Sequence, residues 1–308
     1  MAPMAPLAEG SDDPRNATVR IWIDGQLHPR AEAKVSVFDS GFVLGDGVWE
    51  GLRLVQGRFA FLDAHLDRLF EAAKALFIDI GLTRAELVAA LHATVEANGM
   101  TDGVHVRLMV TRGVKRTPYQ DPRLALGKAT VVILPEHKQP RPEQVARGLT
   151  LFTAHVRRGA PDVQDPKLNS HSKLNCILAC IQAAQAGCDE ALMLDPHGFV
   201  ATCNSTNFFI VRKGEVWTSS GRYCMPGITR ANVIRLCRDA AIPVFEKDFS
   251  LLEVYGADEA FVTGSFAGLV HATEVDGRVI NDRKRGPMVE RLQGLYRELV
   301  ARDTAARR

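Results

Sequence analysis

The sequence lacks the features that would place it in a membrane or an export pathway. No apolar run among its 308 residues approaches the roughly 20 residues that a transmembrane helix needs. The N-terminal stretch MAPMAPLAEGSDDPRNAT has neither the basic start nor the apolar stretch of a secretory signal. We therefore expect a cytoplasmic protein whose residues 1–18 form a flexible N-terminus.

The sequence also lacks paired cysteines and a strong excess of charge. Its six cysteines form no CxxC pair, and Cys176 and Cys180 would need further ligands nearby to bind a metal. We expect reduced thiols and no metal site. The formal net charge of +2 gives no reason to expect nucleic acid or a membrane surface as the main partner.

The order of the predicted elements favours an α+β fold over a doubly wound sheet. Alternating apolar and polar residues on both sides of Asp24-Gly25 indicate a β-hairpin turn. The apolar spacing then changes to that of helices over residues 63–78 and 83–99, the second closed by Gly99. Further strands and helices follow without a regular βαβ period, which is typical of α+β proteins.

The length and one polar segment predict two domains. A chain of 308 residues is long enough for two domains of ordinary size. The segment HKQPRPEQVARG at residues 137–148 is polar and carries two prolines, so it is the best candidate for a linker. The prediction is a small α+β domain over residues 19–136 and a large α+β domain over residues 149–308.

Several motifs, taken in order, resemble the fold-type IV aminotransferases, a family that uses pyridoxal 5′-phosphate (PLP). They are VSVFDSGFVLGDGVWEGLRLVQGRFAFLDAHLDRL, GCDEALMLDPHGFV, CNSTNFFIV, PGITRANVI and DEAFVTGS. The family includes branched-chain and D-amino-acid aminotransferases and aminodeoxychorismate lyase. Because separate motifs occur in the family's order, the signal is stronger than one short motif could give. The resemblance implies a two-domain α+β fold-type IV protein that forms a homodimer.

The resemblance implies a set of phosphate-binding residues. The arginine of the family's H-x-D-R-L motif is Arg68, and a guanidinium fork suits a phosphate dianion. The alternative is a surface arginine paired with a carboxylate of its own helix. In PGITR, the N–H groups of Ile228 and Thr229 open a helix, where an anion is favoured, although the Thr229 hydroxyl could also cap that helix. Ser265 matches the family's last phosphate hydroxyl.

The motif VATCNSTN departs from the family at one position. The family has a glutamate there that pairs with the pyridine nitrogen of PLP, and Thr202 takes its place. A neutral threonine would not hold this nitrogen protonated, which weakens the electron sink of the cofactor. The resemblance implies further cofactor contacts at Ser205, Thr206 and Asn207.

The second departure concerns the lysine that forms an imine with PLP in this family. That lysine precedes the glycine of the G-x-D-E-A motif by about 18 residues, and counting back from Gly187 gives Asn169. An asparagine amide can neither form an imine nor act as a base near neutral pH. Lys173, leaning back from a helix, and Lys167, on the same face of a strand, are the candidate replacements. A third possibility is that no lysine takes over, so covalent attachment of PLP stays open.

The resemblance implies a PLP-dependent aminotransferase-like enzyme that moves an amino group between a small amino acid or amine and a 2-oxo acid. The basic loop TRGVKRTPYQDPR offers Arg112, Lys115, Arg116 and Tyr119 as candidates for substrate contacts, and Arg116 and Tyr119 are the preferred pair. Arg157 and Arg158 are equally plausible from the sequence. One alternative function is a PLP-dependent lyase of the same fold. The other is a homologue without a catalytic lysine that binds PLP or a phosphorylated ligand non-covalently, or catalyses PLP-independent chemistry.

Overall fold

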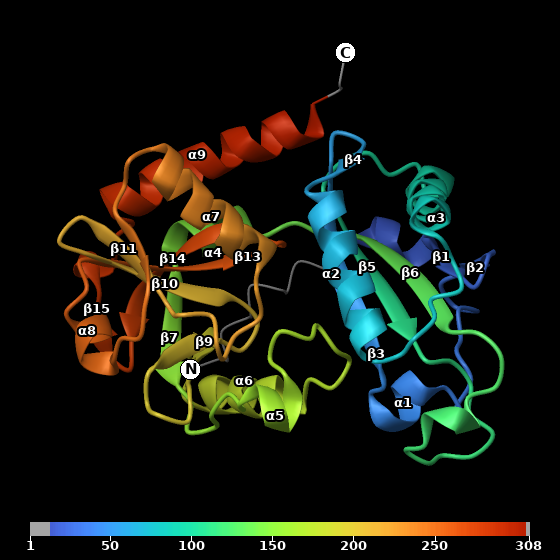
Figure 1. The fold of residues 1–308 in the computed structure, drawn as a ribbon. Coiled ribbons are helices and arrows are strands. Elements are labelled where there is room, and N and C mark those ends of the chain that lie inside the picture. Colours follow the sequence, from blue (N-terminus) through green and yellow to red (C-terminus); the bar gives the residue numbers. More distant parts are fainter. Residues whose placement is uncertain (1–12, 306–308) are drawn as a thin grey trace. The chain divides into compact units, whose positions relative to one another are not determined.

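The computed structural model describes residues 13–305 and divides them into two compact units (Figure 1). The smaller unit consists of residues 13–139, Asn169–Lys173 and residues 303–305. The larger unit consists of Pro140–Leu168 and Leu174–Arg302. Residues 1–12 of the predicted flexible N-terminus lie outside the described residues, and Pro14–Thr18 forms a 3-10 helix.

The smaller unit is built on a six-stranded antiparallel sheet with the strand order β2-β1-β6-β5-β3-β4. Its elements are η1 (Pro14–Thr18), β1 (Arg20–Ile23), β2 (Gln26–Pro29), α1 (Ser40–Leu44), β3 (Gly47–Val55), β4 (Arg58–Phe59), α2 (Leu62–Ala75), α3 (Arg84–Ala97), β5 (Val104–Thr111), η2 (Pro122–Leu124) and β6 (Thr130–His137). Alternate residues of β3 are fully buried, including Val48, Leu52 and Leu54. Helix α2 packs on this strand and covers part of the core.

The local predictions for the smaller unit are confirmed. Strands β1 and β2 pair through a two-residue turn in which Asp24 and Gly25 have φ values of 47° and 99°. Two successive positive φ values are typical of the turn that matches the twist of a hairpin. Helix α3 begins with a reciprocal cap between Thr83 and Glu86, and Gly99 after its end has a φ of 60°.

The larger unit contains a nine-stranded mixed sheet with the order β12-β11-β10-β13-β14-β7-β8-β9, and β15 pairs with β14. Its elements are α4 (Pro142–Arg147), β7 (Leu149–Thr153), α5 (Pro161–Gln164), α6 (Leu174–Gln185), β8 (Glu190–Leu194), β9 (Val200–Cys203), β10 (Asn207–Arg212), β11 (Glu215–Thr218), α7 (Ile228–Asp239), β12 (Val244–Glu246), α8 (Leu251–Tyr255), β13 (Glu259–Gly264), β14 (Gly268–Val275), β15 (Arg278–Val279), η3 (Asn281–Arg283) and α9 (Pro287–Thr304). Parallel and antiparallel pairs both occur, so the predicted α+β class is confirmed. No helix within residues 13–305 is long and apolar enough to cross a bilayer.

The chain passes between the two units more than once, so one linker does not join them. The first division, between residues 139 and 140, falls inside the predicted linker at 137–148, but helix α4 occupies much of that segment. The chain then returns to the smaller unit for five residues, Asn169–Lys173. These residues extend the sheet at β3, because Ser170 forms a β-bridge with Val48. Two domain ranges that are continuous in sequence cannot describe this return.

Candidate functional site

The five-residue return brings Asn169 and Lys173 to the start of β3. The amide nitrogen of Trp49 donates to the carbonyl oxygen of Asn169 at 3.0 Å, and Asn169 is only 3% exposed. Its side-chain Nδ2 donates to the carbonyl oxygen of Trp49 at 2.6 Å. The Nζ of Lys173 donates to Oδ1 of Asn169 at 3.1 Å and lies 5.5 Å from the centre of the Trp49 ring. The amine of Lys173 therefore reaches the position of the Asn169 side chain.

The backbone around Lys173 and Lys167 differs from the predicted backbone. Helix α6 begins at Leu174, so Lys173 precedes the helix and its amine approaches Asn169 through the turn between them. Lys167 lies in an exposed turn that includes a bond from its own N–H to Asp165, and not on a strand. The strand argument for Lys167 is therefore wrong, while its chemical role stays untested.

His171 makes a backbone contact beside this segment. Its Nε2 lies 3.1 Å from the carbonyl oxygen of Val48. Burial lowers the pKa of His171, and the contact with Val48 opposes this shift without reversing it. The neutral ring therefore supports the attachment of the segment to β3.

Arg68 lies on α2 and pairs with a carboxylate of β3. Its Nε and Nη2 donate to Oε1 and Oε2 of Glu50 at 2.7 and 2.6 Å, and His65 Nδ1 lies 2.7 Å from Oε2. Burial alone would raise the pKa of Glu50, but the hydrogen bonds from Arg68 and His65 lower it below its ordinary value. The expected alternative, a carboxylate of the same helix, is therefore not the partner of Arg68 in this pair. Sequence reasoning missed Glu50, although it is a charged residue at an inward position of the alternating strand GVWEGLRLV.

The N-terminus of α7 carries two of the predicted phosphate contacts in the larger unit. Gly227 is the N-cap residue and makes no side-chain cap bond, and Ile228 and Thr229 open the helix. The Thr229 hydroxyl lies 3.3 Å from Tyr296 Oη, so it does not serve as the cap. A twelve-residue helix that begins without a side-chain cap presents N–H groups suited to an anion.

The hairpin between β13 and β14 carries Ser265, which is half-buried in the turn. Two residues earlier, Thr263 is 1% exposed, and its Oγ1 has no hydrogen-bond partner within residues 13–305. A buried hydroxyl without a partner costs free energy that a bound polar group could recover.

Thr202 lies on β9, and Ser205 and Thr206 lie in the turn between β9 and β10, which is anchored by a buried carboxylate. The Thr202 hydroxyl donates to the carbonyl oxygen of Thr206 at 2.7 Å. Oε1 of Glu190 accepts from the hydroxyls of Ser205 and Thr206 at 2.8 and 2.9 Å. Burial raises the pKa of Glu190 against the opposing effect of these two hydroxyls. These contacts fix the loop, and the cofactor contacts assigned to it stay predictions.

Asn207 links the same loop to the start of α7. Its Nδ2 donates to the carbonyl oxygen of Met225 at 3.1 Å and lies 3.5 Å from Thr202 Oγ1. A Cβ atom on Gly227 would lie 2.0 Å from Asn207 Oδ1, so this close approach requires glycine. The loop and the N-terminus of α7 are therefore held together.

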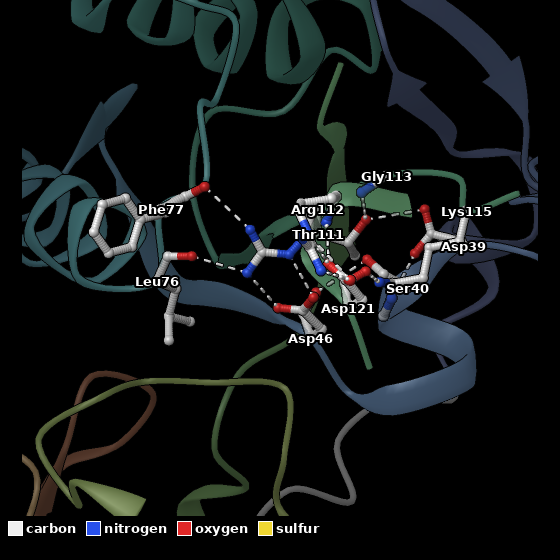
Figure 2. A network of polar contacts seen from close by, with 12 residues as sticks. Asp39, Ser40, Asp46, Leu76, Phe77, Thr111, Arg112, Gly113, Lys115 and Asp121 are labelled. Carbon is white, nitrogen blue, oxygen red and sulfur yellow. Dashed lines mark hydrogen bonds and ion pairs between the residues drawn. The ribbon is translucent and has the colours of Figure 1, made fainter. Parts of the chain in front are cut away.

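Figure 2 shows that Arg112 is part of the scaffold of the smaller unit. Its Nε and Nη2 donate to Asp46 at 2.6 and 3.0 Å, and its guanidinium also donates to the carbonyl oxygens of Leu76 and Phe77 at 2.8 and 3.1 Å. A guanidinium with four such contacts ties the start of β3 to the end of α2. This engagement makes Arg112 a poor candidate for a substrate contact.

The other three candidates of the basic loop differ in exposure: one is buried and two are exposed. Lys115 is 1% exposed, and its Nζ donates to the carbonyl oxygen of Asp121 at 3.0 Å (Figure 2). Arg116 and Tyr119 are exposed, the latter by 59%. Of the four candidates in this loop, the preferred pair is thus the accessible one, and its role stays a prediction.

Comparison with known proteins identifies the family. Residues 47–275 match the family model described as amino-transferase class IV. The chain is 42% identical over 287 residues to branched-chain-amino-acid aminotransferase-like protein 2 of Arabidopsis thaliana, covering 93% of this chain but 51% of that relative. The chain thus spans about half the length of this plant protein.

Two solved structures share the fold over nearly their whole length. The T.th. branched-chain amino acid aminotransferase with pyridoxamine 5′-phosphate has a TM-score of 0.86 and 30% identity, covering 93% of this chain and 95% of that one. The 4-amino-4-deoxychorismate lyase of Pseudomonas aeruginosa has a TM-score of 0.76 and 30% identity, covering 90% and 98%. The fold is that of fold-type IV proteins. The chain belongs to the class IV aminotransferase family.

Proposed function

We propose that this protein is a PLP-dependent aminotransferase-like enzyme that moves an amino group between a small amino acid or amine and a 2-oxo acid. The observation that carries the proposal is the 3.1 Å contact between Lys173 Nζ and Asn169 Oδ1. It brings the amine of Lys173 next to the side chain at position 169, where the family pattern has a lysine, in a chain of that family. A solved relative with pyridoxamine 5′-phosphate gives further support.

The residues of each unit, taken by itself, suit a phosphorylated pyridine cofactor. Arg68 supplies a guanidinium that Glu50 holds in place, and the N–H groups at Ile228 and Thr229 supply donors at a helix N-terminus without a side-chain cap. The hydroxyl of Thr263, which has no hydrogen-bond partner among the described residues, and the half-buried hydroxyl of Ser265 lie in adjoining parts of one hairpin. We assign phosphate contacts to these groups individually, within the unit to which each belongs, since each supplies a hydrogen-bond donor and Arg68 carries a positive charge.

Lys173 is assigned the role of the reacting amine. PLP, when bound, supplies an electron sink for the bond electrons of the substrate Cα. The amine of Lys173 provides covalent attachment and, as the neutral base, accepts the proton that leaves the Cα atom. Asn169 cannot take either role because an amide nitrogen is not basic. Lys167 is the second choice because it lies in an exposed turn.

Thr202 favours a second candidate function. Its hydroxyl already donates to the carbonyl oxygen of Thr206 at 2.7 Å, and it carries no negative charge. A neutral residue of this kind does not hold a pyridine nitrogen protonated, so the ring withdraws electrons less strongly. Reactions that depend less on this withdrawal can then compete with transamination. Elimination by a lyase is such a reaction, and the similarity to a 4-amino-4-deoxychorismate lyase supports it as the alternative.

The proposal includes a homodimer in the cytoplasm that binds small amino acids and 2-oxo acids through Arg116 and Tyr119. The exposed positions of Arg116 and Tyr119 support the substrate assignment. No nucleic-acid or membrane partner is proposed.

The experiment is a half-reaction with PLP-loaded protein and a panel of amino acids. The proposal predicts formation of pyridoxamine 5′-phosphate and a 2-oxo acid, detected by absorbance and mass spectrometry. Lys173→Ala should abolish this product, and the matched variant Lys167→Ala should retain it. Release of ammonia or another elimination product with unaltered PLP would favour the lyase. Equal activity of Lys173→Ala and wild-type protein would contradict the assignment of the amine.

A further inference from the structure

We infer that Asn169 is a positioning residue whose side-chain oxygen holds the amine of Lys173 at the place of the lysine that the family pattern expects. The inference rests on the proposed function for the role of Lys173, and it adds a function for the residue that replaced the usual lysine. In this inference, Asn169 and Lys173 together take the place of the single lysine side chain of the family.

The orientation of the Asn169 amide follows from its two partners. Nδ2 faces the carbonyl oxygen of Trp49 at 2.6 Å, and a carbonyl oxygen only accepts hydrogen bonds. The amide oxygen must therefore face Lys173, whose ammonium only donates, at 3.1 Å. Turning the amide over would place two acceptors together at Trp49 and two donors together at Lys173. The contact is therefore specified from both sides.

The backbone of Asn169 is fixed as well. The N–H of Trp49 donates to its carbonyl oxygen at 3.0 Å, and the neighbouring Ser170 bridges to Val48. With 3% exposure, the acceptor is shielded from water, which strengthens a hydrogen bond to an ammonium group. Asn169 therefore presents a preorganised acceptor to Lys173 on a short return of the chain.

The Trp49 ring alone would not define the position of the amine. Lys173 Nζ lies 5.5 Å from the ring centre, and the guanidinium carbon of Arg107 lies 4.1 Å from it. Two cations thus share one aromatic ring, and they repel each other. The hydrogen bond to Oδ1 of Asn169 gives the Lys173 amine a partner in a defined direction.

Two substitutions at position 169 separate positioning from a purely structural role. Asn169→Leu and Asn169→Asp both remove the donor to the Trp49 carbonyl, and Asn169→Asp also sets an acceptor against that carbonyl, so its structural loss is at least as large. Only Asn169→Asp keeps an oxygen acceptor toward Lys173. Asn98→Leu is the matched control, because Asn98 also bridges backbone groups of the smaller unit, with Nδ2 donating to Arg20 and Thr94 carbonyls at 2.9 and 2.8 Å.

The first measurement is the yield of pyridoxyl label on Lys173 after incubation with PLP and reduction with borohydride. Asn169→Leu should lower this yield roughly tenfold or more, because an amine that is no longer held in one place meets the aldehyde of bound PLP less often. Asn169→Asp and Asn98→Leu should stay within about threefold of wild type, since both keep the acceptor for Lys173. A loss as large in Asn169→Asp as in Asn169→Leu, or no loss in either, would overturn the inference.

The second measurement needs no PLP. Reductive methylation with formaldehyde and cyanoborohydride should modify Lys173 several-fold faster in Asn169→Leu than in wild type, because the ammonium form loses its acceptor. Asn169→Asp should slow it. Equal rates in all three proteins overturn the inference. If these rates differ as expected while wild-type protein gives no PLP label on Lys173, the positioning contact stands and the proposed function fails.

Discussion

Glu50 and Arg68 form a two-pronged salt bridge inside the smaller unit, with nitrogen–oxygen distances of 2.7 and 2.6 Å. The side chain of Glu50 is fully buried and that of Arg68 is 11% exposed. The carboxylate on β3 therefore fixes the plane of the guanidinium on α2. An arginine held in this way loses little conformational freedom when it binds a phosphate.

Arg68 should contribute to PLP binding through the phosphate alone. A single Arg68 substitution would leave Glu50 buried without this cation and destabilise the fold, whereas replacing both partners by neutral residues is far less costly. We therefore choose Glu50→Gln/Arg68→Met. The affinity for PLP should fall roughly 30- to 100-fold, about 2–3 kcal/mol, with little change for pyridoxal, which lacks the phosphate.

Equilibrium binding of both ligands, followed by absorbance, measures this difference. The control is Arg84→Met, which removes an arginine of the same unit that contacts the exposed carboxylates of Asp63 and Asp67. Its affinities should match wild type. An unchanged ratio of PLP to pyridoxal affinity in the double variant would mean that Arg68 does not bind the phosphate.

Glu50 should make the stability of the protein depend on acid pH. Its folded-state pKa lies below the ordinary value of 4.5, because the hydrogen bonds from Arg68 and His65 outweigh the effect of burial. The unfolded chain therefore binds more protons at low pH. The contribution is fully present above the unfolded pKa and is lost as the pH falls through the folded one.

Glu50→Gln tests this dependence. Near neutral pH it should lower the free energy of unfolding by roughly 3 kcal/mol, since it removes one charge of a buried pair. The difference from wild type should narrow as the pH falls below about 4.5. Urea denaturation over a series of pH values measures it. A difference that stays constant with pH would rule out a lowered pKa for Glu50.

Substitutions of Arg112 and Arg116, which lie four residues apart, should affect different properties: the first stability and the second substrate binding. Arg112→Ala removes four contacts with Asp46, Leu76 and Phe77, so the free energy of unfolding should fall by about 2–4 kcal/mol. Arg116→Ala, at an exposed position, should change it by less than about 0.5 kcal/mol. Its effect should be a higher KM for carboxylate substrates. Thermal unfolding and steady-state kinetics on both variants measure these effects. A lower stability of Arg116→Ala than of Arg112→Ala would contradict the prediction.

The local features of the fold could be predicted from the sequence. The Asp24-Gly25 turn, the cap of α3 at Thr83 and its end before Gly99 all depend on the conformational preferences of a few adjacent residues. The α+β class followed from the order of such elements. Family motifs supplied the candidate phosphate residues, because their spacing is visible in the sequence itself.

The contacts between distant residues could not be predicted. The bridge between Val48 and Ser170 joins segments far apart in the chain, and no local pattern indicates that residues 169–173 return to the smaller unit. The position of Lys173 depends on this return, and the helix considered for Lys173 begins one residue later, at Leu174. Glu50 is a different case, since a carboxylate at an inward strand position indicates a buried partner, although not which one.

The most direct test is the site of covalent PLP attachment in the wild-type protein. PLP is added to the full chain, borohydride reduces the complex, and mass spectrometry of the peptides locates the label. We predict a pyridoxyl group on Lys173, four residues beyond the asparagine whose oxygen its amine contacts at 3.1 Å. A label on Lys167 instead, or no covalent label on either lysine while PLP still binds, would contradict the proposed role of Lys173.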